Sequence, residues 1–197
     1  MPVEEHIYND KFFENTIKLE ADSAANFVKI ILQHYSPKSL IDIGCGAGIY
    51  LKEFESRGIN NLLGLDGSTS AGNKFLVDRT KLIIHDLAQP ISFDNRFDLC
   101  LCLEVAEHLR PEDADGLIRT LTDASDQIVF TAATPGQGPR SIGHINEQPH
   151  EYWIDRFKAF GYEYNQQLSE IMRKEMELDG VVWWIVNNLM LFSKKLD

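Results

Sequence analysis

The chain has 197 residues and a hydrophobic content of 44%, which is enough to bury the core of one α/β domain, so we predict a single domain over residues 1–197. Nineteen basic and thirty acidic residues give a formal net charge of −11, which disfavours nucleic acid as a partner because phosphate binding needs clustered Lys and Arg. No apolar run reaches the roughly 18 residues of a membrane-spanning helix, and the acidic start MPVEEH is unlike a signal peptide, so no membrane partner is expected.

Strands and helices alternate along the sequence, which is typical of a parallel sheet with helices on both faces. The N-terminal segment, residues 1–38, contains the first predicted helix at 20–34 and is expected to cover the site. Further helices are predicted at Ile49–Ser56, 71–77 and 111–122, and strands at 40–43, 62–65, 82–84, 97–101 and Gln127–Thr131. A long loop at 133–149 follows, and residues 161–165 and 181–192 are predicted to form an antiparallel hairpin.

The three cysteines, Cys45, Cys100 and Cys102, include no C-x-x-C pair. They predict neither a zinc site nor a disulfide framework, and their odd number favours the reducing cytoplasm. Cys100 and Cys102 alternate on one predicted strand, so we expect both to be buried on the same face of the sheet.

The segment SLIDIGCGAGIY, residues 39–50, predicts a buried strand that runs into a glycine turn and the start of a helix. Gly44, Gly46 and Gly48 remove side chains where the backbone turns tightly and approaches a ligand. Their spacing is G-x-G-x-G behind Asp42, whereas the dinucleotide fingerprint is G-x-G-x-x-G. The spacing therefore disfavours a nicotinamide-dependent oxidoreductase and favours another nucleoside-type cofactor.

Acidic residues follow the next predicted strands. The run NLLGLD ends in Asp66, where a carboxylate can accept hydrogen bonds from both hydroxyls of a ribose. KLIIHDL contains Asp86, which can accept from the exocyclic amino group of an adenine, and FDLCLCLEVAEHL passes from a strand into a turn at Glu104. Because parallel strands end at the same edge of a sheet, these groups describe one site.

With these motifs the chain resembles the class I S-adenosylmethionine-dependent methyltransferases, in particular small bacterial-type members. IDIGCGAG is similar to their glycine motif, LGLDGS to their ribose-binding motif, HDL to their adenine-binding turn and LCLEVAEHL to the segment beside the methionine moiety. The resemblance implies a Rossmann-like α/β fold with a mostly parallel seven-stranded sheet, a C-terminal antiparallel hairpin and helices on both faces. It also implies S-adenosylmethionine as cofactor and a donor site formed by Tyr8, Asp42, Gly44, Cys45, Gly46, Gly48, Asp66, Gly67, Asp86, Leu87 and Glu104.

Glu104, Glu107 and His108 form the pattern E-x-x-E-H at the entry to a predicted helix. Carboxylates at this place stabilise the positive N-terminus of a helix, which is a sufficient reason for them. Some small-RNA and ubiquinone-pathway O-methyltransferases carry a similar pattern and use it with another histidine to hold Mg²⁺, and His144 or His150 would be that ligand here. Because Mg²⁺ prefers oxygen to imidazole, we predict no metal and keep the metal site as an alternative.

The loop residues His144, Asn146, Glu147 and His150 are the predicted acceptor-side groups. Imidazole titrates near neutral pH and can take the proton of an attacking hydroxyl. We predict His144 as the base, because Gly143 gives its backbone the freedom to present it, and Glu147 as the second catalytic candidate. The competing interpretation is that these histidines only fix the loop.

Two groups of aromatic residues complete the candidates. Tyr8, Phe12 and Phe13 either cover the cofactor or form an ordinary apolar helix face. Trp183 and Trp184 are predicted on a strand, where they would face opposite sides of the sheet.

These observations predict methyl transfer from S-adenosylmethionine to a small-molecule acceptor, with O-methylation of a sugar or similar metabolite as the first hypothesis. The lack of a D-P-P-Y or N-P-P-Y motif after the fourth strand disfavours N-methylation of nucleic-acid bases. The alternatives are a Mg²⁺-assisted O-methyltransferase and a non-catalytic, methyltransferase-like binding partner.

Overall fold

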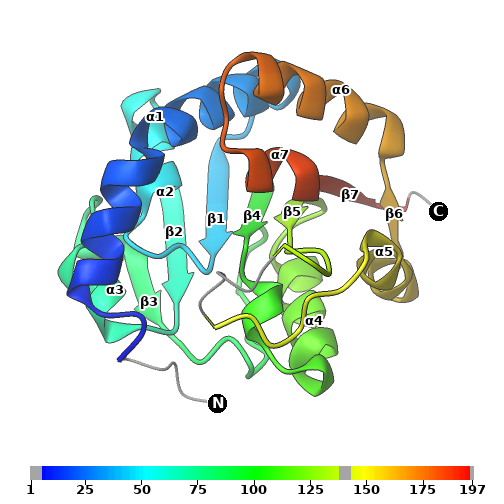
Figure 1. Ribbon diagram of the computed structural model, residues 1–197, viewed down its shortest axis with the longest axis horizontal. Helices are drawn as coiled ribbons and strands as arrows, with labels where there is room; N and C mark the ends of the chain where they lie inside the picture. Colours follow the sequence, from blue (N-terminus) through cyan, green and yellow to red (C-terminus); the bar gives the residue numbers. More distant parts are fainter. Residues whose placement is uncertain (1–5, 138–142, 196–197) are drawn as a thin grey trace.

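A computed structural model of the chain describes residues 6–137 and 143–195. Within these ranges, seven strands form one sheet in the order β3-β2-β1-β4-β5-β7-β6 (Figure 1). The strands from β3 to β5 in this order are parallel neighbours, whereas β7 is antiparallel to both β5 and β6. The strands are β1 (Ser39–Ile43), β2 (Asn61–Asp66), β3 (Leu82–Ile84), β4 (Leu99–Leu103), β5 (Gln127–Thr131), β6 (Tyr162–Tyr164) and β7 (Met190–Lys194).

Helices cover both faces of the sheet, as predicted. One face packs against α1 (Asp10–His34), α2 (Ile49–Ser56), α6 (Gln166–Leu178) and α7 (Trp183–Asn188), and the other against α4 (Ala114–Ala124) and α5 (His150–Ala159). Side chains of β4 alternate between these two cores, and Cys100 and Cys102 are both fully buried on the α4 side, which confirms their predicted placement. Shorter helices are α3 (Thr69–Asn73), η1 (Arg79–Lys81), η2 (Ala106–His108) and η3 (Pro111–Asp113).

The first helix is longer than predicted, because it begins at Asp10 rather than at residue 20. The Asn9 side chain accepts hydrogen bonds from the N–H groups of Lys11 and Phe12, both at 3.1 Å, and so caps the helix. Asn9 followed by Asp10 is a start signal that the prediction overlooked. The added turns carry Phe12 and Phe13 to the carboxyl edge of the sheet.

The prediction that Trp183 and Trp184 lie on a strand is wrong, because both belong to α7. Aromatic and β-branched residues favour strands, but here Ile185 and Val186 bury their side chains in the α1 core as a helix. Trp183 is 54% exposed, and Trp184 is half-buried. The antiparallel pairing of β6 and β7 agrees with the prediction, except that β7 begins only at Met190 and two helices separate the strands.

Two other helices differ in their bounds. The predicted helix at 71–77 is only α3, and the one at 111–122 starts as η3 before α4 takes over. The predicted strand at 97–101 is displaced to β4. Helix ends depend on local caps and turns, so these differences leave the topology unchanged.

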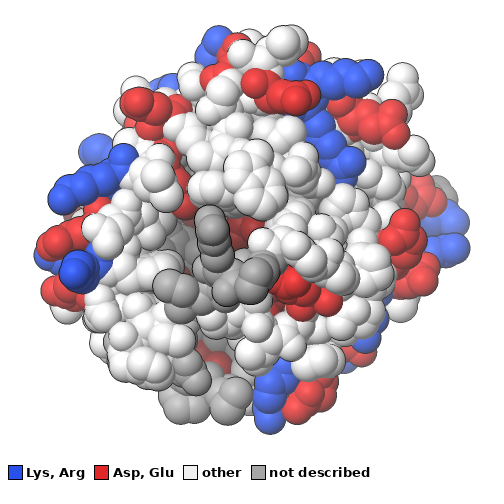
Figure 2. Space-filling view, viewed as in Figure 1, with Lys and Arg blue, Asp and Glu red and all other residues white. Residues whose placement is uncertain are grey.

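The surface agrees with the acidic composition. On the face shown in Figure 2, Lys and Arg side chains of the described residues lie toward the periphery and are interspersed with Asp and Glu. No described helix has both the length and the apolar composition needed to cross a membrane.

Candidate functional site

A cavity of about 520 Å³ opens at the carboxyl edge of the sheet, where the strand order reverses between β1 and β4. Ligands of open α/β sheets bind at such a switch point. The cavity is walled by the start of α1, the turn after β1, the segments that follow β2, β3 and β4, and α7. Ten of the eleven residues predicted for the donor site line it, namely Tyr8, Asp42, Gly44, Cys45, Gly46, Asp66, Gly67, Asp86, Leu87 and Glu104.

The glycine turn has the backbone conformation that its sequence predicts. Gly44, Gly46 and Gly48 have φ angles of 83°, 52° and 75°, which glycine adopts with little strain. The N–H groups of Gly44 and Cys45 both donate to the carbonyl of Leu65, at 2.8 and 2.9 Å, so the turn is anchored to the end of β2. Gly48, the eleventh predicted donor-site residue, lies outside the cavity lining and serves as the N-cap of α2.

Gly44 is also constrained by its neighbour, because an added Cβ would overlap Val105 Cγ2. Gly58 offers a matched control, since it has a φ of 91° and no heavy atom within 4 Å of the position that a Cβ would take. We expect Gly58→Ala to cost about 1–2 kcal/mol of stability through backbone strain, and Gly44→Ala to cost about 1–3 kcal/mol more through overlap. Urea unfolding of both variants measures the difference, and equal losses would contradict the close contact.

Asp66 and Asp86, which were predicted to bind the ribose and the adenine of a nucleoside, both line the cavity. Asp66 Oδ2 accepts a hydrogen bond from the Gly46 N–H, and Oδ1 accepts from the Ser68 N–H, both at 2.8 Å. Asp86 Oδ1 accepts from the Ala88 N–H at 3.1 Å. The Asp66 carboxylate therefore binds the glycine turn and lines the cavity at the same time.

Asp42 is a buried carboxyl group at the floor of the cavity, with 2% of its surface exposed and no hydrogen-bond partner for Oδ2 within the described residues. Burial, and then the negative charge of Asp66, raise the pKa of Asp42 from 3.8 to about 8. A carboxyl group in this state is protonated at neutral pH, unless a bound cation restores its charge.

The raised pKa of Asp42 predicts that the ligand-free protein is more stable in mild acid. The contribution of this group to the free energy of unfolding is complete at pH values below 3.8, where both states are protonated. It is lost as the pH rises through about 8, because over this range the unfolded state has released its proton and the folded state still holds it. Between pH 8 and pH 6 we expect a gain of about 2 kcal/mol from Asp42. Urea unfolding at both pH values should show that this component is missing in Asp42→Asn. An unchanged pH dependence in that variant would contradict the shift.

Glu104 stands in an unusual backbone conformation directly after β4, with a φ of 54°. Its N–H donates to Thr131 Oγ1 at 2.9 Å, and its carboxylate oxygens accept from Asn188 Nδ2 at 3.0 and 3.2 Å. Such strain in a residue other than glycine is typical of functional sites. Asn188 is fully buried. It was not predicted as a site residue, although an asparagine within the apolar run VVWWIVNNLM is a signal for a buried polar contact.

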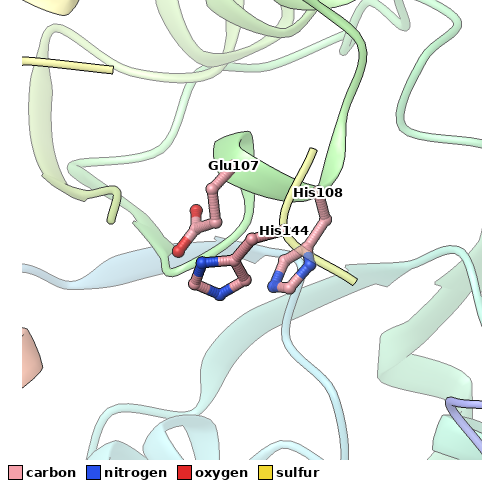
Figure 3. A group of neighbouring side chains, drawn as sticks. All are labelled: Glu107, His108 and His144. Atoms are coloured by element: carbon pink, nitrogen blue, oxygen red, sulfur yellow. The ribbon is translucent and has the colours of Figure 1, made fainter. Parts of the chain in front are cut away.

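The E-x-x-E-H pattern meets the long loop at one point. Glu107 and His108 come from η2 and His144 from the loop, and one ligand atom of each lies within 4.8 Å of the others (Figure 3). The backbone of the loop is fixed there, because the N–H groups of Ile145 and Asn146 donate to the Glu107 carbonyl at 2.9 and 3.0 Å. His150, the other histidine considered for this role, begins α5 and is not part of this group.

The ring nitrogens of both histidines are oriented by oxygen partners. His108 Nδ1 lies 3.1 Å from the Gly143 carbonyl, and His144 Nδ1 lies 2.9 Å from Glu147 Oε1, so Nε2 of each ring is left for another ligand. Burial lowers the pKa of His108 to about 4, which keeps it in the neutral form that metals bind. Glu107 is fully buried and its Oε2 has no hydrogen-bond partner within the described residues.

This donor set fits a divalent cation. One carboxylate and two imidazoles suit Mn²⁺, Zn²⁺ or Fe²⁺ better than Mg²⁺.

The predicted catalytic pair, His144 and Glu147, is hydrogen-bonded together. Neither residue is among the described residues that line the cavity, although their neighbours Gly143 and Ile145 are. Their catalytic role stays a prediction. Glu20 and Arg110 also line the cavity, and neither was predicted as a site residue.

Comparisons with known proteins identify the family of the chain. A family model described as a methyltransferase domain matches residues 18–167. The chain is 34% identical over 87 residues to a ubiquinone biosynthesis O-methyltransferase from Rhodopseudomonas palustris (strain BisA53), a match that covers 38% of this chain and 34% of that protein, so it spans about a third of that relative.

Solved structures share the fold at low sequence identity. The sugar N-methyltransferase KedS8 from Streptoalloteichus sp ATCC 53650 superposes with a TM-score of 0.70 at 13% identity, covering 94% of this chain and 92% of that one. An S-adenosylmethionine-dependent methyltransferase from Archaeoglobus fulgidus has a TM-score of 0.65 at 17% identity and covers 93% and 99% of the two chains. Because the family model covers well over half of the sequence and the seven-stranded fold agrees, the chain belongs to the class I methyltransferases, whose cofactor is S-adenosylmethionine.

Proposed function

We propose that the protein transfers a methyl group from S-adenosylmethionine to a hydroxyl of a small-molecule acceptor, with a sugar or similar metabolite as the first candidate. The observation that carries the proposal is one cavity that combines the G-x-G-x-G turn with Asp66 and Asp86 at the ends of neighbouring strands. Its volume of about 520 Å³ is in the range of small-ligand sites. The acidic surface gives no support for a polyanionic acceptor.

In the proposed reaction the acceptor oxygen forms a bond with the methyl carbon while the bond from that carbon to sulfur breaks. The electron pair stays on sulfur, so S-adenosylhomocysteine leaves as the product. The hydroxyl proton goes to His144 Nε2, while Glu147 Oε1, 2.9 Å from Nδ1, holds the ring. Alignment of donor and acceptor supplies much of the rate in such a displacement, because the sulfonium already provides a good leaving group.

The proposal is tested by incubating the protein with deuteromethyl S-adenosylmethionine and a fractionated metabolite extract. We expect S-adenosylhomocysteine to form and a neutral hydroxyl compound to gain one labelled methyl group in mass spectrometry. The Asp66→Ala variant serves as the control for donor-dependent labelling. Tight binding of NAD, or donor binding with no labelled product in any fraction, would favour the oxidoreductase or the non-catalytic alternative instead.

A second candidate is an O-methyltransferase that orients its acceptor with a divalent cation. Glu107, His108 and His144 support it, because their ligand atoms lie within 4.8 Å of one another and each histidine has an oxygen partner for Nδ1. The partial match to a ubiquinone biosynthesis O-methyltransferase supports O-methylation, which both candidate functions share. The cation would supply a Lewis acid for the acceptor hydroxyl, and the three residues would hold it.

A further inference from the structure

The cavity is lined by carboxyl groups that come from three different parts of the chain. Glu20 lies on α1, Asp42 at the end of β1 and Glu104 after β4, and all three line the cavity. The charges of all three act on the buried Tyr50: burial, and after it the negative charges of Glu20, Asp42 and Glu104, raise the pKa of Tyr50 well above its ordinary value. Asp66 and Asp86, the predicted ribose and adenine ligands, are not counted in this carboxyl cluster, although the charge of Asp66 also acts on Asp42.

No described cation neutralises this cluster. Arg110 is the one Lys or Arg among the described lining residues, and its guanidinium donates to both carboxylate oxygens of Asp113, at 2.8 and 3.1 Å. Asp42 is only 2% exposed, and its Oδ2 lacks a hydrogen-bond partner within the described residues although the residue lines the cavity. Burial, and then the charge of Glu104, raise the pKa of Glu20 to about 7. A positive charge on a ligand would therefore stabilise the ionised forms of these carboxyl groups.

We propose that Glu20 is a charge-selecting residue which, together with Asp42 and Glu104, shifts the relative affinity of the cavity toward cationic S-adenosylmethionine and away from its net-neutral, zwitterionic product. The inference rests on the proposed function and assigns a role within the same site. Donor and product share an α-ammonium and a carboxylate, and only the donor carries a positive sulfonium. Transfer of the methyl group leaves the electron pair on sulfur and removes that one charge. Negative charge on the carboxyl cluster then favours binding of the donor over binding of the product, which assists product release.

The test compares the dissociation constants of S-adenosylmethionine and S-adenosylhomocysteine by titration calorimetry at pH 8, where the parent Glu20 is mostly ionised. Glu20→Gln and Glu20→Met remove the charge with little change in length, and Glu20→Asp keeps it. Glu14→Gln is the matched control, because Glu14 lies on the same helix but pairs with Lys74 at 2.6 Å and does not line the cavity.

We expect the preference for the donor, taken as the ratio of the two dissociation constants, to fall about tenfold in both neutral variants. The ratio should stay near that of the parent in Glu20→Asp and in Glu14→Gln. An unchanged ratio in a folded neutral variant that still binds both compounds would overturn the role of Glu20. A parent protein that binds neither compound would overturn the proposed function itself.

Discussion

Replacing Asp66 with alanine is expected to weaken S-adenosylhomocysteine binding by about 2–4 kcal/mol. The carboxylate lines the cavity and already holds the Gly46 N–H at 2.8 Å, so its removal takes away two charge-assisted hydrogen bonds to a ribose and loosens the glycine turn. Each such bond contributes about 1.5–3 kcal/mol before compensation. Titration calorimetry with the product avoids turnover during the measurement.

The matched control is Asp78→Ala, which removes an exposed carboxylate that caps η1 and lies outside the described cavity lining. Its affinity for S-adenosylhomocysteine should equal that of the parent. Asp66→Asn separates charge from shape, because the amide keeps one oxygen acceptor but loses the negative charge. An Asp66→Ala protein that folds and binds with parent affinity would remove this residue from the donor site.

The strand, glycine turn and helix around Gly44 could be predicted from the sequence because their signals are local. A short apolar run, three glycines at fixed spacing and an acidic residue at the next strand end each act over a few residues. Parallel pairing then brings these ends to one edge of the sheet, so the predicted donor-site residues meet at one cavity. Gly48 is the exception, because a side chain at this position would meet Phe75 rather than the ligand space.

The parts that could not be predicted depend on contacts between distant segments. Asn188 meets Glu104 across 84 positions, and α7 is a helix because its buried side chains complete the α1 core. The choice between His144 and His150 as the additional metal ligand was open in the sequence, and it depends on the Glu107 carbonyl, which binds the backbone of the loop beside His144. Intrinsic propensity carries no information on such contacts.

Replacing His144 with alanine is expected to lower turnover by about 10²–10⁴-fold while S-adenosylhomocysteine affinity stays near that of the parent. The variant removes the Nε2 that both proposed mechanisms use, either as the proton acceptor or as a cation ligand. Turnover is measured as formation of S-adenosylhomocysteine with the acceptor found in the labelling screen. His150→Ala is the control, because His150 is a half-buried histidine of the same region that lies outside the group of Glu107, His108 and His144.

The two mechanisms separate when a cation is removed or added. If His144 acts as a base, exhaustive chelation leaves turnover intact, and the parent takes up no Mn²⁺ in calorimetry. If Glu107, His108 and His144 hold a cation, chelation abolishes turnover, Mn²⁺ restores it, and Glu147→Gln weakens Mn²⁺ binding about 10–100-fold because Glu147 orients the His144 ring. His144→Ala with parent turnover, in an enzyme that is insensitive to chelation, would contradict both mechanisms and leave alignment of donor and acceptor as the source of the rate.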